Sequence, residues 1–226
     1  MGGELDERVK NLFLMGGLRG EGALSCDFLK MFFIEITGGE NFIKIYIPEI
    51  YEIMPQKKIY LLRAGFNGTK FQINDKLKEE INKIYKLGLE LAQPKAVCDT
   101  YKIETIPTEL IPKSFEGVNS ITFFVSTLGY EIDNYISNAN TLSSMLMDAW
   151  ASEAIEAFNE SIDKKLRKDF GKGTRRFSPG YSDIDVRKNW DIVSNLLKTE
   201  IVVVNKETGI ITPRKSTVCM IGWYDE

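Results

Sequence analysis

The chain has 226 residues, of which 43% are hydrophobic and 27% charged, a composition typical of a soluble globular protein with one large or two small domains. A net charge of −3 and a pI near 5.3 argue against a general nucleic-acid binder, which usually carries a basic face. The chain contains no histidine, which excludes Ser-His-Asp and Cys-His catalytic units and removes the commonest metal ligand.

The cysteines and the apolar runs narrow the class of protein further. Cys26, Cys98 and Cys219 are odd in number and far apart, so they predict neither a disulfide framework nor a metal site. No apolar run approaches the ~18 residues that a membrane helix needs. The N-terminus also lacks a secretory signal pattern. We therefore expect a cytoplasmic protein without a membrane or a nucleic acid among its partners.

The N-terminal part of the chain is predicted to form a short helix and several strands. Residues 5–15 have the spacing of a short amphipathic helix. Residues 28–36 and 42–47 are β-prone and flank a glycine-containing turn at 37–41, which predicts a hairpin. Residues 58–66 are predicted to form a further strand, closed by an Asn-Gly pair.

The middle of the chain contains one amphipathic helix and two further strands. Residues 75–91 place apolar side chains at helical spacing, with Asn74 or Asp75 as the N-cap. Residues 96–106 are predicted to form a strand with an irregular pattern. Residues 120–128 are almost continuously apolar, which predicts a strand buried on both faces.

A short helix over 131–136 is followed by a long helix that extends from Leu142 to about Phe170. Asn140 or Thr141 is its predicted N-cap, and the glycines after Phe170 end it. Its many alanine and serine residues let another element approach closely. The basic run 164–168 is interpreted as a solvated helix end, where the helix dipole favours positive charge.

The C-terminal part is predicted to add a helix over 186–197, a hairpin of residues 200–205 and 209–211, and a last strand over 216–223. Strands and helices are mixed without regular βαβ alternation. We therefore predict an α+β fold with a central antiparallel sheet and flanking helices, including one long helix.

The loop of residues 175–181, Arg-Arg-Phe-Ser-Pro-Gly-Tyr, carries the most chemical information. An arginine presents a rigid fork of donors that can hold a carboxylate through two hydrogen bonds. Pro179-Gly180 sets a tight turn where a ligand can touch the backbone. Tyr181 offers a ring for stacking and a hydroxyl group. Such a loop suits a ligand with a carboxylate, an amine and a flat base, although the pattern alone is more often a plain surface turn.

The loop and its context resemble the activation domain of cobalamin-dependent methionine synthase and the shorter standalone proteins related to it. Arg176, Pro179, Gly180 and Tyr181 match the Arg-x-x-Pro-Gly-Tyr hallmark of that family. The other stretches that resemble family segments are residues 127–133, the helix segment 146–157 and the strand entry 212–218. The resemblance covers roughly residues 95–226, and residues 56–95 fit more loosely.

The resemblance implies that the chain binds S-adenosylmethionine and supports reductive methylation of cob(II)alamin as the reactivation subunit of a cobalamin-dependent methionine synthase. A flavodoxin-like protein would donate the electron. Cobalamin would be carried by the partner protein. The corrinoid-binding signature contains a histidine, and this chain has none. The chain would then be a component of a methyltransferase rather than a self-contained enzyme.

The family's ligand contacts carry over to five residues. Arg176 would bind the carboxylate of S-adenosylmethionine, with Arg175 as the alternative. Ser178 and Gly180 would make backbone contacts, and Tyr181 is the loop tyrosine. Glu156, in an Ile-Glu-Ala-Phe context, would be the ligand-contacting helix glutamate, although standing alone it reads as a solvent-facing residue. The resemblance implies no catalytic side chain and no metal ligand in this chain.

Residues 51–226 are assigned to the domain that resembles the activation domain, and residues 1–50 are an unassigned N-terminal segment of the same domain. Two other functions remain open from the sequence. The chain could bind S-adenosylmethionine or a corrinoid protein for another methyltransferase system, or it could be a non-catalytic interaction protein with the same fold.

Overall fold

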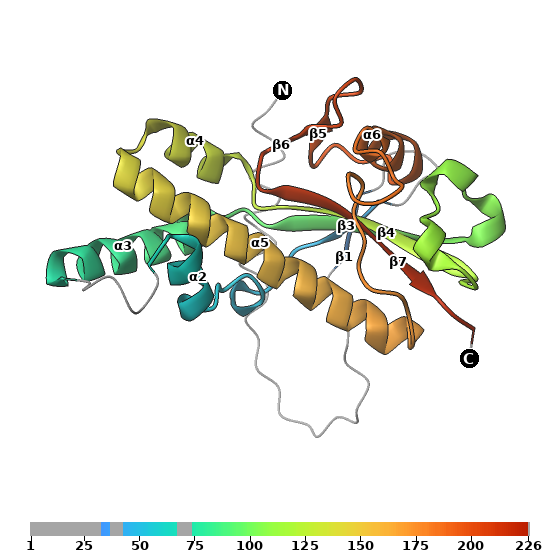
Figure 1. Cartoon of the computed structure of the whole chain (residues 1–226), viewed down its shortest axis with the longest axis horizontal. Helices are drawn as coiled ribbons and strands as arrows, with labels where there is room; N and C mark the ends of the chain where they lie inside the picture. Colours follow the sequence, from blue (N-terminus) through green and yellow to red (C-terminus); the bar gives the residue numbers. More distant parts are fainter. Residues whose placement is uncertain (1–32, 37–42, 67–73, 226) are drawn as a thin grey trace. The chain divides into compact units, whose positions relative to one another are not determined.

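A five-stranded antiparallel sheet lies at the centre of the computed structural model, which describes residues 33–36, 43–66 and 74–225 (Figure 1). The strand order is β1-β2-β3-β4-β7. The strands are β1 (Phe33–Ile36), β2 (Ile43–Tyr46), β3 (Lys95–Lys102), β4 (Ser120–Thr127) and β7 (Ser216–Trp223). The predicted α+β class, with its antiparallel sheet, flanking helices and one long helix, is confirmed.

The first hairpin and the last strand form as the sequence predicts. β1 and β2 pair antiparallel, and β7 pairs with β4 along its whole length. The first residues of the predicted strand 28–36, the turn at 37–41 and the helix predicted over 5–15 lie outside the described residues. β3 ends at Lys102, earlier than predicted, because Lys102 pairs with Ser120, the first residue of β4. The ladder has no partner strand beyond that point, and residues Ile103–Thr105 form the 3₁₀ turn η2.

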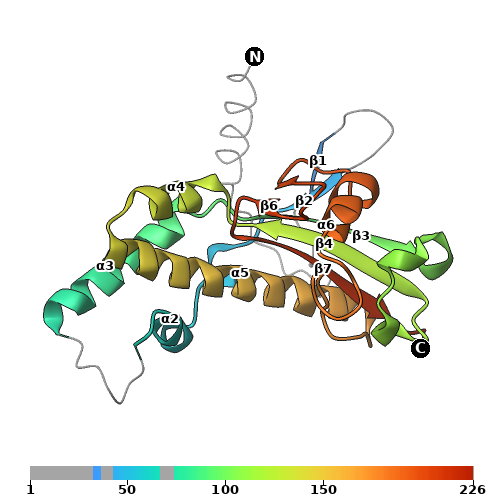
Figure 2. The same cartoon turned by 45° about the horizontal axis from the view of Figure 1, so that its top comes forward.

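The long helix α5 (Thr141–Phe170) lies along one face of the sheet (Figures 1 and 2). The Asn140 side chain accepts a hydrogen bond from the Ser143 amide at 3.0 Å, and Gly171 ends the helix with a φ of 74°. Both predicted helix boundaries are therefore confirmed. Asn159 of α5 is fully buried and bonds the Ser126 hydroxyl of β4 at 2.5 Å, which fixes the helix over the sheet.

Three shorter helices pack against α5: α2 (Lys57–Arg63), α3 (Asp75–Leu91) and α4 (Tyr130–Asn138). The contact with α3 is close, because a Cβ atom at Gly88 would overlap the Trp150 ring of α5. Trp150 itself is fully buried. The side chain of Asn74 accepts the Leu77 amide at 2.9 Å, so Asn74 is the N-cap of α3.

The strand predicted over residues 58–66 is wrong, because this segment forms α2. Tyr60 and Ala64 are buried four residues apart, whereas Leu62, which a strand would bury beside them, is 47% exposed. That is the spacing of one helix face. A short apolar run fits both periods, and packing against α5 selects the helix.

The opposite face of the sheet is covered by short elements, including α6 (Lys188–Trp190) and the π-helical turn η5 (Asp191–Leu196). The helix predicted over 186–197 forms as one uninterrupted helical run from Lys188 to Leu196, which is α-helical in α6 and π-helical in η5. The predicted hairpin forms from β5 (Val203–Val204) and β6 (Ile211–Thr212). The remaining 3₁₀ turns are η1 (Ile50–Glu52), η3 (Thr108–Leu110) and η4 (Lys113–Phe115).

β4 is buried on both faces, as predicted, because elements cover the sheet from each side. Phe123 and Val125 belong to the core that includes Ile192 and Val193 of η5. Ser126 faces α5 instead, through its bond to Asn159. Among the described helices, none combines the length and the apolar character needed to cross a membrane.

Candidate functional site

The loop after α5 runs back along β7 and positions Arg176. Phe177 and Met220 exchange two backbone hydrogen bonds, of 2.9 and 2.8 Å. Neighbouring side chains of such an extended segment point to opposite sides. Phe177 packs edge-on against Phe115, with ring centroids 6.1 Å apart, on the side of η5. Arg176 therefore points toward α5.

Arg176 forms an ion pair with Glu156, which lies 20 residues earlier in the chain and was predicted from the sequence to belong to the same site. The guanidinium Nη2 donates to Glu156 Oε2 at 2.9 Å, and Nη1 lies 4.0 Å from Glu160 Oε2. The Arg176 side chain is 21% exposed and the Glu156 side chain 48% exposed. Such a half-exposed ion pair contributes about 0–1 kcal/mol to the free energy of unfolding.

Arg176 and Glu156 line a pocket of about 460 Å³, which we call the Arg176 pocket. Its volume falls within the range of about 300–1,000 Å³ that is typical of small-molecule sites. The charged side chains that line it are Glu52, Glu153, Glu156, Glu160, Lys164 and Arg176. The other lining residues are Tyr51, Met54, Gln56, Ala157 and Ser161. Four carboxylates and two cations, Lys164 and Arg176, thus line one cavity.

One stripe of α5 supplies most of these charges. Glu153, Glu156, Glu160 and Lys164 follow one another at intervals of three or four residues, which places them on one face of the helix. Glu153 is held by Arg63 of α2, with Nε and Oε2 2.9 Å apart. Within the described part of the chain, only one of the five N–H donors of Arg176 makes a hydrogen bond. Arg176 therefore retains donors for a ligand.

A buried cluster beneath the pocket joins the segment before α2 to α5. The Glu52 carboxylate accepts hydrogen bonds from the Tyr46 hydroxyl, the Ser161 hydroxyl and the Lys165 ammonium group, and from the Glu49 amide at 2.8 Å. Burial alone would raise the pKa of Glu52, but these hydrogen bonds outweigh it and lower the pKa. Burial, with the bond to Glu52, raises the pKa of Tyr46. The cluster therefore consists of an ionised Glu52 and a neutral Tyr46.

Lys165 corrects the interpretation of residues 164–168 as a wholly solvated helix end. Its side chain is 20% exposed and pairs with Glu52, whose side chain is 3% exposed. Lys164 remains 69% exposed, as that interpretation expected. Sequence periodicity could not separate the two lysines, because the carboxylate that turns Lys165 inward lies 113 residues earlier in the chain.

Sequence reasoning missed the apolar rim of the pocket. Tyr51 is 70% exposed and Met54 is 44% exposed, and both line the Arg176 pocket. They lie between Pro48 and Pro55 in a short segment rich in large apolar side chains. That composition, between two prolines, is the one signal by which the sequence could have pointed to them.

The other predicted ligand contacts lie farther along the loop. Ser178 bonds the Cys219 sulfur at 3.3 Å, and burial raises the pKa of that thiol to about 12. Gly180 has a φ of 95°, which favours glycine, and its amide donates to the Ile184 carbonyl. Tyr181 is 71% exposed, and the residues that line the Arg176 pocket do not include Arg175, Ser178, Gly180 or Tyr181.

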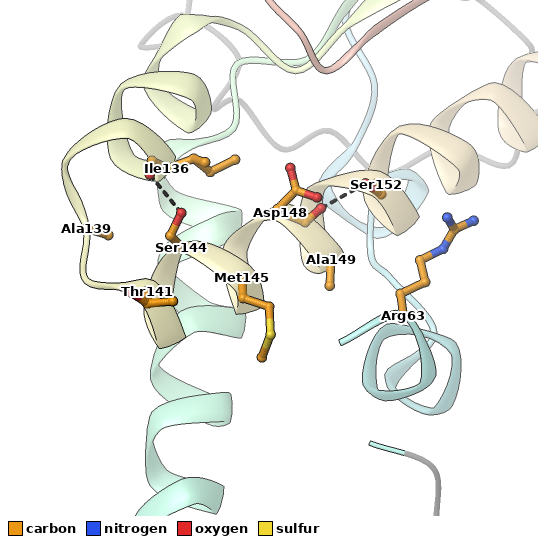
Figure 3. Close-up of a pocket in the computed structure, with 9 residues that line it drawn as sticks. All are labelled: Arg63, Ile136, Ala139, Thr141, Ser144, Met145, Asp148, Ala149 and Ser152. Carbon is orange, nitrogen blue, oxygen red and sulfur yellow. Dashed lines mark hydrogen bonds between the residues drawn. The ribbon is translucent and has the colours of Figure 1, made fainter. Parts of the chain in front are cut away.

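A second pocket, which we call the Ser144 pocket, lies along the N-terminal half of α5 (Figure 3). It is larger, at about 720 Å³. It is lined by Arg63, Ile136, Ala139, Thr141, Ser144, Met145, Asp148, Ala149 and Ser152. The Ser144 and Ser152 hydroxyls donate to backbone carbonyls, and the Asp148 carboxylate pairs with Lys215 at 2.8 Å. Its two serine hydroxyls and its carboxylate are thus occupied, whereas Arg63 makes one hydrogen bond, to Glu153 at 2.9 Å.

Comparison with known proteins identifies the architecture. The structure aligns with the crystal structure of the MetH reactivation domain bound to AdoHcy, with a TM-score of 0.53 and 14% sequence identity. The alignment covers 80% of this chain and 78% of that one. The chain has the fold of the MetH reactivation domain. No protein-family model matches the sequence, and no curated protein matches it either. The likeness to the reactivation domain therefore rests on the fold.

Proposed function

We propose that the chain binds S-adenosylmethionine in the Arg176 pocket and acts as the reactivation subunit of a cobalamin-dependent methionine synthase. The observation that carries the proposal is the meeting of Arg176 and Glu156 at one cavity, in a chain with the fold of a reactivation domain that binds AdoHcy. Both residues were selected from sequence motifs, and they lie on separate elements.

The charges of the pocket fit the ligand at both of its ionic groups. The free donors of Arg176 suit the carboxylate of the amino-acid end. Glu156 and Glu160 are exposed carboxylates beside the same cavity, and they favour the ammonium and sulfonium groups. The ion pair of Arg176 with Glu156 keeps both side chains at the site while no ligand is bound. Ser178, Gly180 and Tyr181 do not line the Arg176 pocket, and their contacts with the ligand stay a prediction from the sequence.

The chain's contribution to the reaction would be orientation. When bound, S-adenosylmethionine supplies an activated methyl group. The carboxylate clamp of Arg176 would fix the amino-acid end against α5, and the buried Glu52–Lys165 pair would hold the opposite wall in place. Cobalamin would arrive on a partner protein in the cytoplasm, with a flavodoxin-like protein as electron donor. This chain has no histidine, so it cannot supply an imidazole ligand to the cobalt of cobalamin.

Calorimetric titration with S-adenosylmethionine tests the binding step. We expect binding by the wild-type chain and a loss of about 1.5–3 kcal/mol in binding free energy for Arg176→Ala, because a charge-assisted hydrogen bond is removed. Arg175→Ala is the matched control and should bind like the wild type, since Arg175 is exposed and does not line the pocket. Equal affinities of the wild type and Arg176→Ala would refute the assignment.

Visible spectroscopy tests the partner step. The chain would be mixed with a cobalamin-loaded methionine synthase in the Co(II) state, S-adenosylmethionine and a reductant. We expect the spectrum of methylcobalamin to form with the wild type and far more slowly with Arg176→Ala. Binding of S-adenosylmethionine without any spectral change would instead favour service to another methyltransferase system.

A further inference from the structure

Tyr51 is an exposed aromatic side chain at the rim of the Arg176 pocket. Its side chain is 70% exposed, whereas the next two residues, Glu52 and Ile53, are 6% and 2% exposed. Met54 is again exposed and lines the same pocket. The segment thus presents a ring and a thioether to the cavity and buries the two residues between them.

The backbone under Tyr51 is firmly held. The Ile53 amide donates to the Ile50 carbonyl at 3.3 Å, which closes the 3₁₀ turn η1 around Tyr51. Glu52, the adjacent residue, is anchored to α5 by Ser161 and Lys165. The ring therefore projects from a fixed platform. With the backbone fixed, only the side-chain torsions of Tyr51 remain to be ordered when the ring contacts a ligand.

The residues that line the pocket are of two chemical kinds. Glu156, Glu160 and Arg176 are charged, which suits an amino-acid group. Tyr51 and Met54 bring large apolar side chains to the same cavity. A ring and a polarisable sulfur favour contact with the face of a flat, π-rich group. The sequence assigned the aromatic contact to Tyr181, which does not line this pocket.

We propose that Tyr51 stacks on the planar heteroaromatic base of the ligand in the Arg176 pocket, with Met54 beside it. This inference rests on the proposed function, because it takes the ligand to carry a base at one end and an amino acid at the other. Arg176 then holds one end and Tyr51 the other. The pocket recognises nucleoside-linked amino acids rather than amino acids in general.

Calorimetry with three probes separates the two ends of the ligand. Adenosine carries the base alone, methionine carries the amino-acid end alone, and S-adenosylmethionine carries both. Tyr51→Ala should bind adenosine and S-adenosylmethionine about 5-fold to 100-fold more weakly and methionine within about twofold of the wild type. Tyr51→Phe should bind all three like the wild type, because it keeps the ring. Arg176→Ala should bind methionine more weakly than the wild type does and should bind adenosine with unchanged affinity.

Proton NMR of bound adenosine reads the stacking directly. The base protons H2 and H8 should shift upfield with the wild type and with Tyr51→Phe, and they should not shift with Tyr51→Ala. Unchanged binding of S-adenosylmethionine and adenosine by Tyr51→Ala, with Arg176→Ala still impaired, overturns the inference and leaves the proposed function standing. A wild-type chain that binds no S-adenosylmethionine overturns both.

Discussion

The two halves of α5 each form one wall of a pocket, and the larger pocket is the poorer candidate for a ligand site. The Ser144 pocket has a volume of about 720 Å³ and the Arg176 pocket about 460 Å³. In the Ser144 pocket, Asp148 pairs with Lys215, and Arg63 makes one hydrogen bond to Glu153, but no aromatic side chain is among the lining residues. In the Arg176 pocket, a guanidinium with unused donors lies beside two exposed carboxylates, and an exposed tyrosine ring lines the same cavity.

The difference teaches that recognition depends on which groups meet at a cavity and not on the volume of the cavity alone. Small and hydroxyl side chains of the N-terminal half leave room, but their donors are bonded to the backbone of α4 and α5. The C-terminal half gathers opposite charges from α5 and from the loop beside β7. Its buried Glu52–Lys165 pair also fixes a third segment against the cavity.

Removal of the buried cation should have the largest effect. Lys165→Met leaves the Glu52 carboxylate buried without its counter-ion, so we expect a loss of about 3 kcal/mol in the free energy of unfolding. Urea denaturation measures it. Lys164→Met is the control and should stay within about 0.5 kcal/mol of the wild type, because Lys164 is 69% exposed. Similar losses in both variants would show that Lys165 has no special anchoring role.

A conservative change at Arg176 should have a smaller effect. Arg176→Lys keeps the positive charge but removes the planar fork that can hold a carboxylate through two bonds. We expect a loss of about 1 kcal/mol in the binding free energy of S-adenosylmethionine, less than for Arg176→Ala. Calorimetry checks the order. If Arg176→Lys binds as weakly as Arg176→Ala, the site needs the fork and not the charge.

Acid should weaken the C-terminal half through Glu52. Because hydrogen bonds hold the pKa of Glu52 below its ordinary value near 4.5, its contribution to stability is present above pH 4.5 and is lost as the pH falls through its folded-state pKa. Between about pH 5 and about pH 3, the unfolding free energy of the Glu52→Gln variant should therefore depend less on pH than that of the wild type. A change at the exposed Glu116 should leave the wild-type profile unaltered.

Changes in the Ser144 pocket should have the smallest effect. Ser144→Ala and Met145→Ala should alter the affinity for S-adenosylmethionine by less than about twofold, or about 0.4 kcal/mol. Met145 is 43% exposed, so its truncation also leaves little cavity. A strong loss of affinity in either variant would move the ligand to the larger pocket and reverse the comparison.

The sequence predicts much of the fold, because its strongest signals are local. The caps at Asn74 and Asn140 and the glycine after Phe170 mark helix ends through their own side chains or backbone freedom. The strand β4 is almost continuously apolar, which is typical of a strand buried on both faces. Residues 58–66 lack such a signal, and only packing against α5 makes them helical.

The candidate site could be predicted in part for the same reason. Arg176 and Glu156 belong to recognisable motifs, whereas Tyr51 and Lys165 gain their positions from contacts between distant segments. The turn that exposes Tyr51 depends on Glu52, and Glu52 depends on donors more than 100 residues away. No local sequence pattern indicates a contact between segments so far apart in the chain. Whether Ser178, Gly180 and Tyr181 contact a ligand stays a prediction.

The most direct test of the central claim is a two-dimensional NMR titration of the labelled chain with S-adenosylmethionine. The account predicts saturable shifts at Tyr51, Glu156 and Arg176, with the signals of Ser144 and Met145 unmoved. Shifts confined to the Ser144 pocket, or no shifts at millimolar ligand, would contradict it.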